Sequence, residues 1–417
     1  MKFYEKTTLP NGIRVLTQEV NSIKSFTLGI WVNVGSRDEE KSLNGLSHFI
    51  EHCVFKGTKT RNAKEIASSV ESLGGYINAY TTKEHTCFYT RALNEHFSES
   101  FEVLADLVKN PTFPEDEIEK EKSVILEEIS SINDTPDDVI FDLIEEKLFD
   151  GHGLANPIIG KEENILSFNS ELARNFIEQN YSANKIIVSV AGPVSHSLVV
   201  EKAEQLLGDL QPKNSEHTRV EPSLLNNRVE IEEYRDINQV HICIARKTFG
   251  LKDERRSALA LLNTLIGGMT SSRLFQLIRE EQALAYNITS FINNYFDASV
   301  FGVYLSTSLN NRNRAIDLIK KEFQSITTDG IKTEELEIAR NYLKGGISMS
   351  LENTSAKSTH LAVSEFYYGE VKSLEEIFNL IDRVSKDEIM NLAEELLKWE
   401  DFSIYQIMPK MGGKNGN

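Results

Sequence analysis

Hydrophobic and polar residues recur along the chain with two different spacings, one of two residues and one of three to four. A spacing of two is typical of strands with one buried face, and the longer spacing is typical of amphipathic helices. In the first half the pattern predicts strands at residues 13–17, 26–34 and 185–191 and a β-hairpin over residues 76–82 and 86–91. It predicts helices at residues 46–56, 63–73, 96–110, 115–132 and 135–151, and one more that ends near Leu210. In the helix over 115–132 the expected buried side consists of Ile118, Val124, Ile125, Ile129 and Ile132.

The second half repeats this order of elements. The pattern predicts strands at 229–233 and 240–245, helices at 254–266 and 271–282, a hairpin over 288–306, and helices at 311–326, 333–350 and 355–368. A repeated order indicates tandem duplication. We therefore expect an α+β fold of two homologous domains, each a mainly antiparallel sheet with helices packed on one face. The expected boundaries are 1–215 for the first domain, 216–230 for a linker and 231–417 for the second domain.

Composition narrows the class of protein. The chain has 417 residues, of which 40% are hydrophobic and 26% charged, as in a soluble globular protein. No apolar run reaches 18 residues and the N-terminus does not resemble a signal peptide, so we expect no membrane insertion and a cytoplasmic location. The net charge of −18 makes nucleic acid an unfavourable partner. The acidity suits cationic peptide substrates, although solubility alone also explains it. The three cysteines, an odd number in apolar stretches, are expected to be reduced core residues.

The strongest chemical motif is His48-Phe-Ile-Glu51-His52 within the predicted helix over 46–56. Residues four apart lie one above the other on a helix, so the two imidazoles are directed at one point. Neutral imidazoles are zinc ligands, and a catalytic zinc site takes a third protein ligand and keeps one position for water. Glu51 is then available for proton transfer. The order His-x-x-Glu-His is the inverted zincin motif, and its alternative is a surface helix with two polar histidines.

With this motif, the chain resembles the pitrilysin family of zinc metallopeptidases. Its length is similar to that of the half-length bacterial members of the family, which are themselves similar to mitochondrial processing peptidase. The resemblance implies a third zinc ligand about 75 residues beyond the second histidine, in a context similar to Val124-Ile-Leu-Glu127-Glu128. Glu128 lies 76 residues beyond His52 and is the preferred third ligand. Glu127 is the neighbouring candidate and points about 100° away on a helix. Glu121 matches the family carboxylate that holds a ligand in place, although it is also consistent with a solvated charge.

The resemblance also implies a substrate site. Asn78-Ala79-Tyr80-Thr81 matches the family strand that binds an extended peptide by main-chain hydrogen bonds. Arg279 and Tyr286, seven residues apart, match a pair that reaches the cleaved bond, and both side chains are suitable donors to an oxyanion. Arg273 is the alternative to Arg279.

The resemblance implies a zinc endopeptidase that cleaves unfolded peptides in an enclosed chamber. His48, His52 and Glu128 would hold one Zn²⁺ per chain, and Glu51 would be the general base. Because the chain is half as long as the single-chain members, two copies are expected to form a homodimer. One alternative is a presequence processing peptidase with an unlike partner subunit. Another is a non-catalytic structural subunit, although such chains usually lose part of the motif that is complete here.

Overall fold

Two compact units make up the structure, a computed structural model that describes residues 3–213 and 219–410. The first unit contains residues 1–131, 152–220 and 349–373, and the second contains 132–151, 221–348 and 374–417, so far as they are described. The continuous ranges 1–215 and 231–417 expected from the sequence differ from these units, because residues 132–151 belong to the second unit and residues 349–373 to the first. Part of the expected linker lies outside the described residues, and residues 219–229 form neither helix nor strand.

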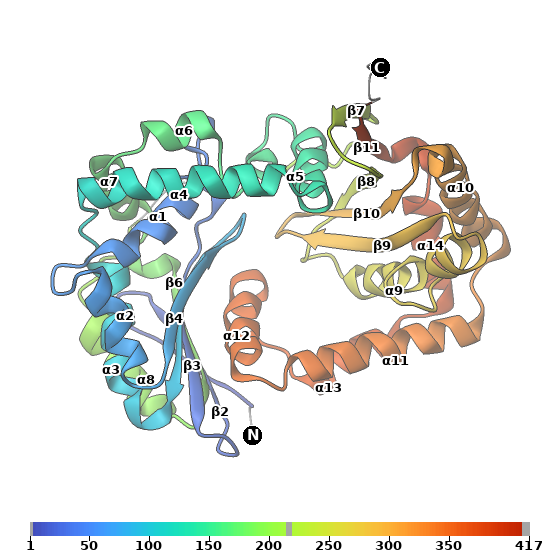
Figure 1. Ribbon diagram of the computed structural model, residues 1–417. Coiled ribbons are helices and arrows are strands. Elements are labelled where there is room, and N and C mark those ends of the chain that lie inside the picture. The colour runs from blue at the N-terminus through green and yellow to red at the C-terminus, as the bar shows by residue number, and fades with distance from the viewer. Residues whose placement is uncertain (1–2, 214–218, 411–417) are drawn as a thin grey trace, which may run out of the picture. The chain divides into compact units, whose positions relative to one another are not determined.

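The first unit is built on a six-stranded sheet with the order β1-β2-β6-β3-β5-β4 (Figure 1). All neighbours are antiparallel except β2 and β6. The strands are β1 (Glu5–Thr8), β2 (Arg14–Glu19), β3 (Ser25–Val32), β4 (Tyr76–Thr81), β5 (Thr86–Leu93) and β6 (Ile186–Gly192). Strand β6 is buried throughout and β3 is buried except at Ser25, which fits their places inside the sheet, whereas β4 is an edge strand.

Helices cover both faces of this sheet. Alternate residues of a strand point to opposite faces, and Ile30 packs under α1, α2, α3 and α8 while Trp31 packs against Leu361 of α12. The helices of the unit are α1 (Leu46–Cys53), α2 (Ala63–Glu71), α3 (Phe97–Lys109), α4 (Glu115–Asn133), α6 (Glu162–Ser167), α7 (Ser170–Asn180), α8 (His196–Leu207) and α12 (Thr354–Tyr368). The sequence predicted a helix over residues 355–368, but not its place against the first sheet.

The second unit repeats the plan with a five-stranded sheet in the order β7-β11-β8-β10-β9. Its strands are β7 (Glu230–Arg235), β8 (Val240–Phe249), β9 (Ala285–Asn294), β10 (Ala298–Thr307) and β11 (Ser403–Pro409). In the second sheet β7 pairs in parallel with β11, which lies beside β8, just as β2 of the first sheet pairs in parallel with β6, which lies beside β3. The expected α+β fold of two homologous domains is confirmed, although β11 was not predicted.

The helices of the second unit also lie on both faces of its sheet. Phe141 of α5 packs against Phe291 and Tyr304, with ring centroids 4.9 and 5.4 Å apart. The helices are α5 (Pro136–Leu148), α9 (Arg256–Ile266), α10 (Arg312–Asp329), α11 (Thr333–Ser350), α13 (Leu374–Arg383) and α14 (Lys386–Leu396), with a π-helix at Phe275–Glu281. The sequence had predicted an ordinary helix over 271–282.

Two smaller expectations have clear outcomes. The three cysteines are free and buried, as expected. Val124, expected on the buried side of α4, is 50% exposed, because the first half of that helix packs through Ile118, Glu121 and Ile125.

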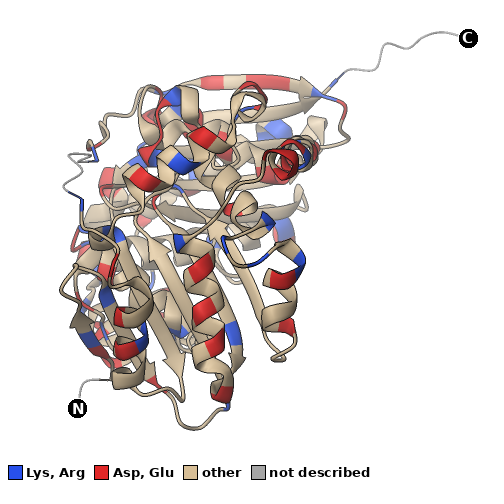
Figure 2. Cartoon of the chain, turned by 90° about the vertical axis from the view of Figure 1, so that its left-hand side faces the viewer, with Lys and Arg blue, Asp and Glu red and all other residues tan. Residues whose placement is uncertain are grey.

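Figure 2 shows acidic and basic residues interspersed along individual helices. Among the described residues, no helix combines the length and the apolar character that crossing a membrane requires.

Candidate metal centre

The first turns of α1 place the two histidines of the motif on one side of the helix. His48 is buried and His52 is partly exposed, with ring centroids 4.6 Å apart. Glu128 on α4 approaches both, with its Oε2 atom 3.8 Å from His48 Nε2 and 3.5 Å from His52 Nε2. These separations are too long for hydrogen bonds. Two ligands of a tetrahedral zinc at 2.0–2.1 Å lie about 3.4 Å apart. The two distances from Glu128 are close to this spacing, and one ligand atom from each of the three residues lies within 4.8 Å of the others.

The chemistry of the donors also fits zinc. His52 Nδ1 is 2.9 Å from Glu121 Oε1, so its protonated Nδ1 donates to Glu121 and Nε2 is left free to bind a metal. Among the described residues, His48, His52 and Glu128 are the one group of three or more such side chains spaced to share a metal ion. Glu127 is exposed and is not part of the group.

Glu121 connects the metal centre to a second charge. Its side chain is 7% exposed and accepts from His52, and its other oxygen lies 2.5 Å from Lys56 Nζ. Burial alone would raise the pKa of Glu121, but the bonds to His52 and Lys56 outweigh it and lower the pKa below its usual range. Lys56 was not singled out from the sequence. Its position four residues after His52 could have indicated it, because both then lie on one side of the helix.

Burial and neighbouring carboxylates set the protonation of the motif. Burial, together with the nearby His52, lowers the pKa of His48 to about 3, so this ring is neutral at pH 7. For His52, burial acts to lower the pKa, but the bond to Glu121 and the surrounding carboxylates raise it. Burial raises the pKa of Glu51, with Thr81 acting against the shift. A raised carboxyl pKa suits a group that accepts a proton near neutral pH.

The predicted substrate strand is β4, at the free edge of the first sheet and packed beside α1. Asn78 is exposed, Tyr80 is partly exposed and Ala79 is buried. The N–H of Ala79 donates to the side-chain Oδ1 of Asn78 at 2.9 Å. Thr81, at the end of the strand, faces Glu51. The edge strand β4 and Glu51 are thus neighbours within one unit.

Arg279 and Tyr286 are brought together in the second unit by two backbone irregularities. Arg279 lies in the π-helix, and its Cζ is 4.7 Å from the ring centre of Phe275 and 5.0 Å from that of Tyr286. In the β9–β10 pair Ser306 lies opposite Asn287 but Thr307 lies opposite Ala285, so Tyr286 is the extra residue of a β-bulge. Such bulges redirect side chains, and Tyr286 is 78% exposed.

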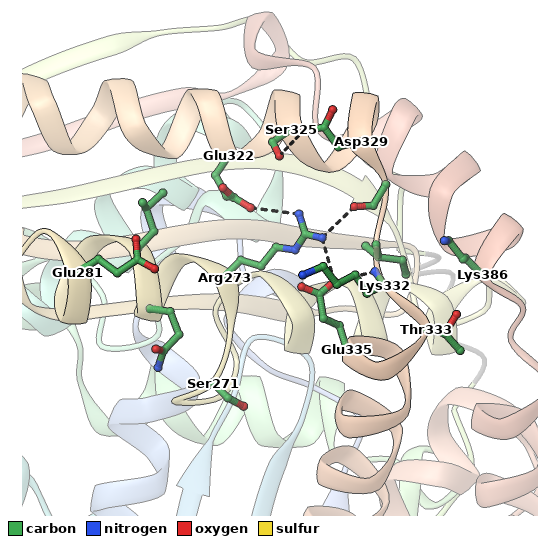
Figure 3. Close-up of a pocket in the computed structure, with 14 residues that line it drawn as sticks. Ser271, Arg273, Glu281, Glu322, Ser325, Asp329, Lys332, Thr333, Glu335 and Lys386 are labelled. Carbon is green, nitrogen blue, oxygen red and sulfur yellow. Dashed lines mark hydrogen bonds and ion pairs between the residues drawn. The ribbon is translucent and has the colours of Figure 1, made fainter.

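Arg273, the alternative to Arg279, has a different environment. It lines a pocket of about 820 Å³ within the second unit (Figure 3). Its guanidinium donates to Glu322 at 3.2 Å, to Glu335 at 2.9 Å and to the carbonyl of Gly330 at 2.8 Å. These contacts hold Arg273 inside its own unit, whereas the Arg279 side chain is 36% exposed.

Comparisons with known proteins identify the family of the chain. The family described as Insulinase (Peptidase family M16) matches residues 14–162, and the family described as Peptidase M16 inactive domain matches residues 167–343. A Bacillus subtilis protein named as an uncharacterized zinc protease, YmxG, is 35% identical over 405 residues, which cover 97% of this chain and 98% of that protein. A zinc protease of Mycobacterium leprae, also named as uncharacterized, is 34% identical, with 94% and 89% covered.

Two solved structures share the fold. One is described as a peptidase M16 inactive domain from Pseudomonas fluorescens, with a TM-score of 0.91 at 19% identity over 99% of both chains. The other is a protease from Helicobacter pylori, with a TM-score of 0.89 at 20% identity over 97% of this chain and 99% of that one. Both sequence relatives are named as zinc proteases. The chain belongs to the insulinase family of zinc peptidases, family M16.

Proposed function

We propose that this protein is a zinc-dependent endopeptidase with its catalytic centre at the meeting of α1 and α4. The observation that carries the proposal is the convergence of His48, His52 and Glu128 beside Glu51. His48, His52 and Glu128 would hold one zinc ion per chain. When bound, zinc would polarise the peptide carbonyl and lower the pKa of a coordinated water.

Glu51 is the proposed general base. It follows His48 by three residues and precedes His52 by one, so its carboxylate projects from the same turn of α1 but is not one of the ligand atoms. It would accept the proton of the attacking water and deliver it to the leaving amine. Burial raises its pKa, which supports both steps, because a weakly basic carboxylate would not take up the proton.

Strand β4 is the proposed docking site for the substrate. An extended peptide can add to an exposed sheet edge by main-chain hydrogen bonds, which places no strict demand on its sequence. The peptide would replace the contact from Asn78 Oδ1 to the N–H of Ala79. Binding to a sheet edge needs an unfolded segment of the substrate. An enclosed chamber between two copies of the chain would in addition select substrates by size.

Arg279 and Tyr286 are the proposed donors to the developing oxyanion, and we propose that they act from the partner copy of a homodimer. Their stacking leaves the phenol and the guanidinium accessible, whereas Arg273 is committed to Glu322 and Glu335. A guanidinium and a phenol placed at the carbonyl oxygen stabilise the charge that develops there.

Cleavage of a mixed peptide library, with and without a chelator, tests the proposal. Glu51→Gln should retain zinc and lose nearly all cleavage, because the amide keeps the shape and cannot accept the proton. Glu128→Gln should lose zinc, and Glu127→Gln on the exposed side of α4 is its matched control. Cleavage that persists in Glu51→Gln, or zinc lost from Glu127→Gln rather than Glu128→Gln, would show that the roles are misplaced.

A further inference from the structure

A carboxylate outside the zinc motif lies at the start of the motif helix. Glu39 is 6% exposed, and both of its oxygens face N–H groups. Oε1 accepts from the N–H of Ser47 at 2.6 Å, and Oε2 accepts from the N–H of Gly45 at 2.7 Å and from Asn44 Nδ2 at 3.1 Å. Ser47 directly precedes His48. The side chain therefore binds the backbone of the first turn of α1, next to the first proposed metal ligand.

The start of α1 needs such a partner because its own N-cap cannot supply one. The N-cap is Gly45, with φ of 98° and no side chain, where helices commonly use Ser, Thr, Asp or Asn. A larger residue is excluded, since a Cβ on Gly45 would lie 2.7 Å from the Cα of Gly160. The first N–H groups of a helix have no acceptor within the helix. Ser47 is fully buried, so water cannot replace the carboxylate there.

The other end of the motif is held by a different carboxylate. Glu121 bonds the ring of His52, whereas among the described residues Nδ1 of His48 is buried without a hydrogen-bond partner. The orientation of His48 thus depends on packing and on the backbone that carries it, and Glu39 binds that backbone one residue away.

We propose that Glu39 is a positioning residue for the metal centre, which holds the first turn of α1 so that His48 meets His52 and Glu128. The inference rests on the proposed zinc site. An uncharged amide at position 39 would have to turn its NH₂ group toward one of the backbone N–H donors, because both oxygens already accept. Replacement by Gln should therefore break the hydrogen bond to the N–H of either Gly45 or Ser47.

Zinc affinity in the folded protein tests the proposal. The affinity is measured by competition with a chromophoric chelator for the full-length wild type, Glu39→Gln and Glu40→Gln. Glu40 is the exposed neighbour, so Glu40→Gln makes the same chemical change without touching α1. We expect Glu39→Gln to bind zinc about tenfold more weakly or worse, in the range seen when groups that orient metal ligands are replaced. Glu40→Gln should match the wild type.

Thermal unfolding separates positioning from stability alone. A purely structural Glu39 would lower the melting temperature of Glu39→Gln and leave the zinc affinity of the folded fraction unchanged, and that result overturns the inference. If Glu39→Gln does not fold, Glu39→Asp retains the charge on a shorter side chain, and wild-type affinity in that variant also overturns it. Absence of zinc binding by the wild type would instead reject the proposed function itself.

Discussion

Replacing Glu121 by Ala should weaken zinc binding while the ligand residues themselves remain in place. Glu121 is 7% exposed and bonds His52 Nδ1 at 2.9 Å. A hydrogen bond to a buried charged group contributes about 1.5–3 kcal/mol. One tenfold change in affinity corresponds to about 1.4 kcal/mol, so the loss should be about 10- to 100-fold. Glu121→Gln should lose less, because its amide oxygen can still accept from Nδ1.

The controls separate ring orientation from loss of charge. Glu117→Ala removes another carboxylate of α4, which accepts a hydrogen bond from the exposed Lys120 at 2.6 Å. A surface pair of this kind contributes less than about 1 kcal/mol to stability. Lys56→Ala removes the second partner of Glu121 but keeps the bond to His52. Zinc dissociation constants from chelator competition should be near the wild-type value in both. If Glu121→Ala stays within about twofold of the wild type, the ring of His52 does not need Glu121, and the reasoning is wrong.

Three further predictions address other parts of the molecule. Gly160→Ala should lower the free energy of unfolding by more than about 2 kcal/mol in denaturant titrations, because its φ is 83° and a Cβ would lie 2.5 Å from a neighbouring backbone Cα; a change below about 0.5 kcal/mol would contradict this. Burial, together with the nearby guanidinium of Arg219, lowers the pKa of His85 from 6.5 to about 4. Between pH 6.5 and 4 the folded chain therefore binds fewer protons than the unfolded chain, so the free energy of unfolding decreases as the pH falls through this range. His85→Phe should remove up to about 3 kcal/mol of that loss, and equal pH slopes for variant and wild type would refute it. Glu51→Gln and Arg279→Ala chains, each nearly inactive alone, should regain about a quarter of wild-type cleavage when mixed with subunit exchange; exchange confirmed by mass without recovery would reject the shared site.

Local chemistry made part of the metal centre predictable. The pairing of His48 with His52 follows from helical geometry alone, because residues four apart lie on one side of a helix. Glu128 came from the family resemblance, and its distances of 3.5 and 3.8 Å from the two rings fit that assignment. The duplication was visible because the spacing of apolar residues switches between strand and helix in the same order twice.

What the sequence did not show depends on long-range contacts. An amphipathic pattern says that a helix has a buried face but not which sheet covers it, so α5 and α12 could not be assigned to the units in which they lie. The exposure of Tyr286 follows from one extra residue in the β9–β10 register, which the strand pattern does not reveal. Glu39 lies in a polar loop, and its importance comes from the Gly45 cap six residues later.

Helix α9 of the second unit can be compared with the motif helix α1. Helix α9 takes the corresponding place after the first two strands of its unit, and its buried positions are apolar apart from Thr264. Apolar side chains can be buried without hydrogen-bond partners at no cost, whereas burial of a polar group that lacks a partner costs free energy. Helix α1 buries Ser47 and His48, and burial lowers the pKa of His48 to about 3, which shows how unfavourable a charged ring would be there. Glu39 and Glu121 are carboxylates that bind the two ends of the motif in this otherwise apolar setting. The fold therefore forms twice from one plan, and in the unit with the candidate metal centre these two carboxylates bind the motif helix in addition to its candidate ligands.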